Sequence, residues 1–299
     1  MKNQVSNKES KNVYQMVTDR VIEQMQQGII PWHQPWVGVA GAINYVSRKP
    51  YSQLNQFLLG REGEWLTFKQ VKACGGSVKK GVKASFVVFY QMTVKKVEVD
   101  VKNENGEVEK QEREKQIPVL RYYNVFHIDD CEGIESKNKP TEQGEQLQPV
   151  ERAEKVINGY VQREGLTFQN QQPSADAYYR PSTDTVVVPM LKQYEIVEEY
   201  YSTTFHELTH STMHPDRCNR KADMKTAAFG KEDYSREELV AEIGSAMLCT
   251  VTGLDCDKAF KNSVAYIQGW LGALKNDNKA IVWAASRAEK AAKYIMGEQ

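Results

Sequence analysis

The sequence predicts an α+β protein of two domains, a small α+β domain followed by a mainly helical one. The chain has 299 residues, 40% of them hydrophobic, which is long for one compact domain and sufficient for two cores. Short β-prone runs occur mostly before residue 130, whereas helical periodicity dominates after residue 150. Two prolines and two glycines fall within residues 131–150, where large apolar residues are few. The predicted boundaries are a domain at 1–135, a linker at 136–150 and a domain at 151–299.

The first predicted element is a helix near the N-terminus. In "SKNVYQMVTDRVIEQMQQGIIPW" the apolar residues Val13, Val17 and Val21 recur at helical spacing. Ser10 is the expected N-cap and Gly28 the expected stop. This helix is predicted to open the N-terminal domain.

Residues 43–130 change to a β pattern. The runs "SFVVFYQMTV" and "VLRYYNVFHI" are separated from their neighbours by Gly, Pro and Asn. Between them, residues 95–116 alternate Val with charged residues around Asn105 and Gly106. An Asn-Gly pair flanked by such alternation predicts a long solvated hairpin tip.

The C-terminal half is predicted to be mainly helical, with one β segment at 184–190, "DTVVVPM". Helices are expected at about 151–164, 191–213, 235–251, 257–275 and 278–296.

Composition excludes several classes of protein. No apolar N-terminal stretch resembles a signal peptide, and no run of about 18 apolar residues would span a membrane. The five cysteines are scattered without a C-x-x-C pair, which favours neither a disulfide framework nor a thiolate zinc site. A soluble protein of the reducing cytoplasm, without a membrane partner, is expected.

One stretch of the C-terminal half is rich in histidine. In "TTFHELTHSTMH", residues 203–214, three of the chain's five histidines fall within nine positions. Because positions i and i+4 share a helix face, His206 and His210 can present two imidazoles to one cation, with Glu207 beside them. The competing interpretation of this H-E-x-x-H pattern is an amphipathic helix with two exposed histidines. His214 lies about 12 Å further along the helix axis and is expected to be a helix-end residue.

The third ligand is expected from the next helix. The segment "YSREELVAEIGSAML", residues 234–248, places Glu238 and Glu242 on one face. Zinc hydrolases with two His and one Glu as ligands take the carboxylate from a second helix. Glu238 is therefore the predicted ligand. Glu242, one turn further on, would accept a hydrogen bond from the outer N–H of a ligand histidine. Alternatively, Ser235 and Glu238 form a capping box and Glu242 is the ligand. Glu237 is a third choice.

The predicted chemistry is hydrolysis of a peptide bond. With three protein ligands, Zn²⁺ keeps an open position where water becomes acidic, and Glu207 takes its proton while the ion polarises an amide carbonyl. Another divalent cation such as Mn²⁺ is an alternative to zinc. Tyr234 is a candidate oxyanion donor or, alternatively, a packing residue. The β-prone run at 184–190 suits either an edge strand that aligns a peptide or a buried strand.

The N-terminal third is basic and aromatic. Residues 1–94 hold twelve Lys or Arg against five Asp or Glu, a net charge of +7 in a chain of zero formal net charge. The combination predicts sequence-tolerant binding of single-stranded DNA, with phosphates on lysines and bases on aromatic rings. The competing interpretation is a solvated lysine run beside core aromatics. The candidate lysines are Lys69, Lys72, Lys79, Lys80 and Lys83, and the candidate aromatic residues are Trp32, Trp36 and Trp65 together with Tyr45, Tyr51 and Phe68.

Six stretches of the sequence, in order along nearly the whole chain, resemble one protein family. The N-terminal stretches resemble the N-terminal domain of ArdC-type antirestriction proteins, also present in plasmid primases of the TraC kind: "VYQMVTDRVIEQMQQGIIPWHQPW", "WLTFKQVKACGGSVKKGVKASFVVFY" and "RYYNVFHIDD". The C-terminal stretches are similar to the metallopeptidase-like domain of the same family: "FHELTHSTMHPDRCNR", "FGKEDYSREELVAEIGSAMLC" and "YIQGWLGALKNDNKAIVWAASRAEKAAKYI".

The resemblance implies a DNA-binding N-terminal domain for single strands joined to a zincin-like metallopeptidase domain. Such proteins are carried on conjugative plasmids or other mobile DNA and protect it from host restriction. Carried onto matching positions, the resemblance implies His206 and His210 as metal ligands, Glu207 as the catalytic carboxylate and Glu238 as the third ligand. The related IrrE and ImmA metallopeptidases, with a Glu on the helix after H-E-x-x-H, favour Glu238 over Glu242.

Three hypotheses of function follow. In the first, the protein binds incoming single-stranded DNA and cleaves an unidentified protein there. In the second, it shields DNA without catalysis and its metal is structural. In the third, it is a regulatory protease of the IrrE or ImmA kind that cuts a repressor.

Overall fold

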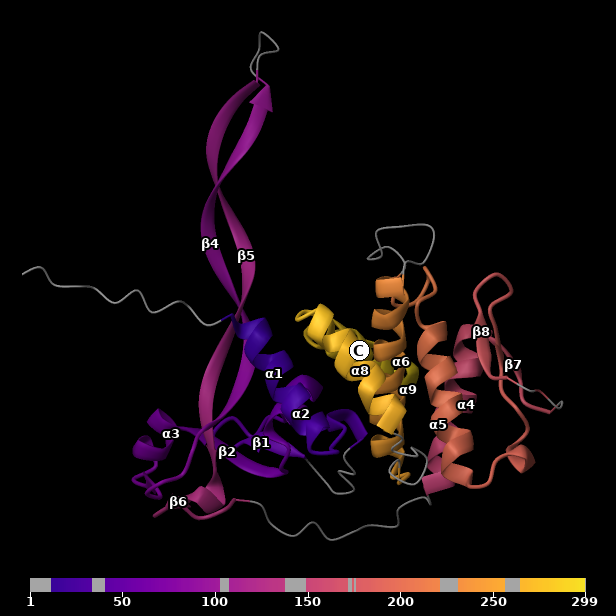
Figure 1. Cartoon of the computed structure of the whole chain (residues 1–299), viewed down its shortest axis with the longest axis horizontal. Helices are drawn as coiled ribbons and strands as arrows, with labels where there is room; N and C mark the ends of the chain where they lie inside the picture. Colours follow the sequence, from indigo (N-terminus) through magenta and orange to yellow (C-terminus); the bar gives the residue numbers. More distant parts are fainter. Residues whose placement is uncertain are drawn as a thin grey trace, which may run out of the picture.

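The computed structural model describes residues 12–33, 41–102, 108–137, 149–171, 174, 176–220, 231–255 and 264–298. The predicted α+β class is confirmed, with a C-terminal half rich in helix. The N-terminal elements lie beside a group of C-terminal helices, and a long two-stranded ribbon projects away from them (Figure 1).

The N-terminal half is built on a four-stranded sheet in the order β1-β2-β5-β4. Strands β1 and β2 are parallel and the other pairs antiparallel, and β3 pairs with β6 in a separate two-stranded sheet. The strands are β1 Ala42–Asn44, β2 Gly63–Thr67, β3 Ser77–Val78, β4 Ser85–Lys102, β5 Val108–His127 and β6 Cys131–Glu132. The helices are α1 Val13–Gln26, η1 Pro31–His33, α2 Gln53–Leu59, α3 Phe68–Ala73 and η2 Ile128–Asp130.

Helix α1 forms where the apolar spacing predicts it, but its N-cap differs. The side chain of Asn12 accepts a hydrogen bond from the backbone N–H of Tyr14 at 3.1 Å, so Asn12 and not Ser10 caps the helix. Ser10 lies outside the described residues. Val17, Val21 and Met25 form the buried face of α1.

The predicted hairpin is confirmed as the ribbon of β4 and β5, which stay paired from Ser85–Val125 to Lys102–Val108. Its predicted tip at Asn105 and Gly106 lies outside the described residues. At its root, the amide side chain of Asn55 bonds to both the N–H and the C=O of Val88, at 2.7 and 2.9 Å. The amide therefore satisfies the edge of β4 as a further strand would.

The C-terminal half packs its helices beside a small sheet of order β7-β9-β8. Its elements are α4 Pro149–Glu164, β7 Thr167–Gln169, β8 Tyr178–Arg180, β9 Thr185–Val187, η3 Leu191–Gln193, α5 Val197–Ser211, α6 Lys231–Thr252, α8 Val264–Asn276 and α9 Ala280–Met296. The helix expected at 191–213 is thus a short η3 turn followed by α5. The predicted strand at 184–190 is shortened to β9, which ends before Pro189, a residue with no N–H for a ladder.

One hydrophobic core joins the two halves. It contains Val21 of α1 and Phe57 of α2 as well as Phe205 of α5, Leu239 of α6 and Ala288 of α9. Trp32 of η1 is only 2% exposed, and its ring lies against Phe57 and, edge-on, against Trp270 of α8, with centroids 6.5 and 6.2 Å apart. The segment after α1 therefore packs an apolar ring between an N-terminal and a C-terminal helix.

Within the described part of the chain, no helix is both long and apolar enough to cross a bilayer. Four cysteines lie in the described part of the chain and form no disulfide with one another: Cys74, Cys131, Cys218 and Cys249.

Candidate metal centre

Helix α5 places two histidine rings side by side. His206 and His210 are one turn apart on its last two turns, and their Nε2 atoms lie 3.1 Å from each other. Two buried threonines of this helix satisfy their hydroxyls within it: Thr204 and Thr209 donate to the carbonyls of residues 200 and 205. Both imidazoles thus face the same point in space.

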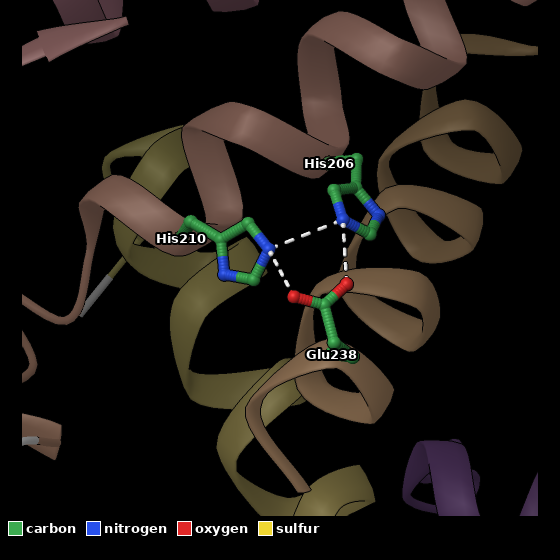
Figure 2. A group of neighbouring side chains, drawn as sticks. All are labelled: His206, His210 and Glu238. Carbon is green, nitrogen blue, oxygen red and sulfur yellow. Dashed lines mark hydrogen bonds and ion pairs between the residues drawn. The ribbon is translucent and has the colours of Figure 1, made fainter. Parts of the chain in front are cut away.

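Helix α6 brings a carboxylate to the same point. The two oxygens of Glu238 lie 3.5 Å from His206 Nε2 and 3.5 Å from His210 Nε2, and the three side chains converge (Figure 2). Helix α6 begins at Lys231, so Ser235 lies inside the helix. The alternative in which Ser235 and Glu238 form a capping box is therefore wrong.

The spacing of these atoms fits a divalent metal ion. Ligand atoms held about 2.0–2.1 Å from a tetrahedral ion lie about 3.3 Å from one another. The three nearest-atom distances here are 3.1, 3.5 and 3.5 Å. Two imidazole nitrogens and one carboxylate also form a donor set that transition-metal ions accept. Among the described residues, one group of His, Cys, Asp or Glu side chains is close enough to hold a metal ion: His206, His210 and Glu238.

A separate carboxylate faces the outer nitrogen of each histidine. Glu237 Oε1 lies 3.4 Å from His210 Nδ1, and Glu242 Oε1 lies 3.9 Å from His206 Nδ1. Such partners orient ligand imidazoles and keep the inner nitrogen unprotonated. Glu237, the third choice for a ligand, therefore sits behind His210 rather than at the point of convergence.

The two helices approach closely because α6 has a glycine where they cross. A Cβ atom added to Gly244 would lie 2.6 Å from Thr209 Cγ2 and 2.8 Å from Thr209 Oγ1. The next residue of α6, Ser245, donates its hydroxyl to the carbonyl of Ser202 of α5 at 2.7 Å. This close approach lets a carboxylate of α6 reach the imidazoles of α5.

Glu207 lines a pocket beside the three convergent side chains. The pocket has a volume of about 560 Å³ and is lined by Ala177, Tyr178, Tyr179, Pro181, His206, Glu207, His210, Met213, Glu237 and Glu238. Burial raises the pKa of Glu207, the two imidazoles lower it, and the charge of Glu238 raises it; the net pKa is above its ordinary value. A hydrogen bond with the backbone of Tyr179 ties this carboxylate to strand β8.

The site carries excess negative charge. Burial alone would lower the pKa of His206, but its hydrogen bond to Glu238 and the charges of Glu242 and Glu207 outweigh burial and raise it. For Glu237, burial raises the pKa, but hydrogen bonds with His210 and the Arg220 guanidinium hold it below its ordinary value. A cluster that favours a proton on its imidazole in this way also favours a divalent cation.

Three sequence predictions concern the surroundings of the cluster. Strand β9 is the central strand of its sheet, between the edge strands β7 and β8, so the run at 184–190 is the buried strand and not the edge strand of the two alternatives. His214 lies beyond the end of α5, where its Nδ1 accepts a hydrogen bond from the N–H of Asp216 at 3.3 Å, and it is not part of the cluster. The backbone of Tyr234 is in α6, but its side chain lies outside the described residues.

Comparisons with known proteins agree with this geometry. Residues 153–287 match the family model of a zincin-like metallopeptidase, and residues 11–126 match that of the N-terminal domain of anti-restriction factor ArdC. A metal-free crystal structure of antirestriction protein ArdC from plasmid R388 is 31% identical, with a TM-score of 0.69, and the match covers 96% of this chain and 99% of that one. The chain belongs to the ArdC family.

Another structure of the R388 ArdC protein, with Mn(II) bound, is 30% identical with a TM-score of 0.68. A DNA primase TraC of Escherichia coli is 32% identical over 96% of this chain. This member of the ArdC family spans only 27% of the length of that primase.

In the ArdC-type N-terminal half, the lysines and the tryptophans predicted to bind DNA differ in their exposure to solvent. Lys69, Lys72, Lys79, Lys80 and Lys83 are all exposed. Trp32 and Trp65 are 2% and 4% exposed, so the prediction that they stack on bases is wrong: both rings fill hydrophobic cores. Trp36 lies outside the described residues.

The exposed aromatic residues of this half lie elsewhere. Phe68, at the start of α3, is 54% exposed, next to the lysines and within cation–π distance of Lys72, whose Nζ is 5.7 Å from the ring centroid. It is the one exposed ring among the five described candidate aromatics. Four other exposed rings, which were not predicted, lie at the ribbon root: Phe89, Tyr90, Tyr122 and Tyr123. Because neighbouring residues of a strand point to opposite faces, alternation along the β runs could have indicated at most one ring of each adjacent pair.

Proposed function

We propose that this member of the ArdC family protects mobile DNA from restriction by two linked activities. Its N-terminal half binds single-stranded DNA, and its metal centre hydrolyses peptide bonds of a protein met on that DNA. The convergence of His206, His210 and Glu238 beside Glu207 is the observation that carries the hydrolytic part. Fusion to a DNA-binding half raises the local concentration of the peptidase near DNA-bound targets.

In the proposed reaction each residue of the pocket has a separate task. A divalent cation, held by His206, His210 and Glu238, supplies Lewis acidity toward a carbonyl oxygen. Glu207 accepts the proton of the attacking water and later returns it to the leaving amine. Burial raises the pKa of Glu207, which is the direction that suits a carboxylate acting first as a proton acceptor and then as a donor.

Strand β8 is the proposed guide for the substrate. It is one of the two edge strands of its sheet, and its residues Tyr178 and Tyr179 line the pocket. An extended peptide can add to such an edge through main-chain hydrogen bonds, which align it without demanding a specific sequence.

Removal of the metal is expected to abolish hydrolysis and leave DNA binding intact. Peptide cleavage should disappear after dialysis against a chelator and return on addition of Zn²⁺ or Mn²⁺, because the cation is the only Lewis acid proposed. The measurement is cleavage of an unfolded protein, with single-strand binding by fluorescence anisotropy in parallel. Cleavage that survives complete metal removal would contradict a metallopeptidase function.

The DNA-binding surface is proposed to combine the exposed lysines with Phe68. Lys69 and Lys72 lie on α3 with Phe68, and Lys79, Lys80 and Lys83 follow in the β3–β4 segment. Lysines neutralise phosphates whatever the sequence, and an exposed phenyl ring offers any base a stacking face.

Binding of single strands is expected to weaken steeply with salt. For the variant Lys80→Gln with Lys83→Gln, the slope of log K against log salt should become shallower by about 1.4, since each phosphate contact contributes about 0.7 for single strands. Lys155→Gln with Lys275→Gln is the matched control: it removes the same charge from exposed positions on α4 and α8 and should leave the slope unchanged. Equal slopes for the wild type and the Lys80 and Lys83 variant would place the DNA surface elsewhere.

A further inference from the structure

A buried ion pair lies directly behind one of the proposed metal ligands. Arg220 and Glu237 have side chains only 2% and 4% exposed. Arg220 Nε donates to Glu237 Oε2 at 3.0 Å and Nη2 donates to Oε1 at 2.5 Å, a bidentate arrangement. The oxygen that receives Nη2 is also the one that faces His210 Nδ1, at 3.4 Å.

The remaining donors of Arg220 hold the end of helix α5. Nη2 also donates to the carbonyl of Thr209 at 2.9 Å, and Nη1 donates to Thr212 Oγ1 at 2.5 Å. Thr209 precedes His210, and its carbonyl is among the last of the helix, which lack partners within α5. Arg220 thus fixes both the backbone that carries His210 and the carboxylate that faces its ring.

This arrangement determines which nitrogen of His210 carries a proton. Both oxygens of Glu237 accept hydrogen bonds from Arg220. The remaining lone pair of Oε1 faces His210 and can only accept, so a hydrogen bond there requires a hydrogen on Nδ1 of His210. The neutral ring then keeps its proton on Nδ1, and the lone pair of Nε2 points at His206 and Glu238. Stability alone is a weak reason for such a pair, since buried ion pairs often give no more stability than apolar side chains.

We propose that Arg220 and Glu237 are positioning residues that set the affinity of the centre for a divalent cation by holding His210 in its metal-binding tautomer and orientation. The inference rests on the proposed metal centre. It adds two residues that act through His210 without touching the ion, and it assigns a role to the segment that follows α5.

The test compares Glu237→Gln and Arg220→Met with the wild type in the full chain. Glutamine is nearly isosteric but has one acceptor oxygen. Its NH₂ group faces Arg220 Nε if it replaces Oε2, and both Arg220 Nη2 and His210 Nδ1 if it replaces Oε1. Affinity for Zn²⁺, measured by competition with a chelating indicator, is expected to fall about 10–100-fold in each variant. Where the NH₂ group faces His210 in metal-free Glu237→Gln, the ring ¹⁵N shifts of His210 should move toward the Nε2–H tautomer.

Arg217→Met is the matched control. Arg217 is equally buried, at 3% exposure, and also clamps the segment after α5: it pairs with Asp184 at 2.5 Å and donates to the carbonyl of Ser211 at 2.9 Å. It contacts none of the three convergent residues. Its replacement should lower the thermal unfolding temperature without changing Zn²⁺ affinity, so the control separates positioning from general stability.

The outcomes are distinct. Weaker Zn²⁺ binding in both variants, with normal binding in Arg217→Met, supports the proposal; if Arg220→Met does not fold, the Zn²⁺ affinity of Glu237→Gln decides. Variants that bind Zn²⁺ as tightly as the wild type overturn it. Absence of Zn²⁺ and Mn²⁺ binding by the wild type itself overturns the proposed metal centre, and this inference with it.

Discussion

Replacing Glu207 by alanine is expected to lower the rate of peptide hydrolysis by about 10²–10⁴-fold, the range that a positioned general base contributes. Glu207 lines the pocket next to His206, whereas Glu237 and Glu242 face the outer nitrogens of the histidines and Glu238 completes the cluster. It is therefore the pocket carboxylate left to accept a proton from water. Metal binding and single-strand binding should persist, because Glu207 is not part of the convergent set.

The decisive measurement couples this variant to protection of DNA. Cleavage of an unfolded protein and transfer of a plasmid into a restricting recipient are compared for the wild type, Glu207→Ala and Glu199→Ala. Glu199 is an acid in the first turn of the same helix, outside the pocket lining, and its loss should leave both readouts unchanged. Protection that survives Glu207→Ala at full strength would reject the protease function and leave a protein that shields DNA by binding alone.

Replacing Trp32 by alanine is expected to lower the free energy of unfolding by about 3–5 kcal/mol, as truncation of a buried aromatic residue does. The ring packs between Phe57 of the N-terminal half and Trp270 of the C-terminal half, so its loss opens a cavity in the core that both halves share. Urea unfolding followed by fluorescence and by circular dichroism measures the change. Because the core is common, both signals should shift together.

Phe68→Ala is the comparison variant, because it removes an exposed ring instead of a buried one. Its ring is 54% exposed, so its removal should change stability by no more than about 0.5 kcal/mol. If Phe68 stacks on a base, the same variant should weaken single-strand binding by about 1–3 kcal/mol. Trp32→Ala should show the opposite pattern, with stability lost and DNA affinity kept at low denaturant. Loss of DNA affinity without loss of stability in Trp32→Ala would mean that the ring reaches the DNA.

Much of the fold could be predicted from periodicity. Helices α1, α4, α5, α6 and α9 and the β4–β5 hairpin form close to the predicted places, because each shows one spacing over many residues. Five strands of two or three residues each, β1, β3, β6, β7 and β8, were not predicted, since so few residues show no period. The start of α6 at Lys231 also lies before the point where its apolar pattern begins, and this excluded the capping box at Ser235.

The candidate metal site could be predicted from the sequence, because H-E-x-x-H places His206 and His210 on one helical face through local geometry and a following helix carries Glu238. How that site is held, and which side chains are exposed for DNA, depend on tertiary contacts. The Arg220–Glu237 pair depends on contacts across 17 residues of sequence, and Gly244 matters only because α5 crosses there. Burial likewise depends on the whole core: Trp32 and Phe68 are both aromatic residues in a basic domain, and their opposite exposure is set by what packs against them.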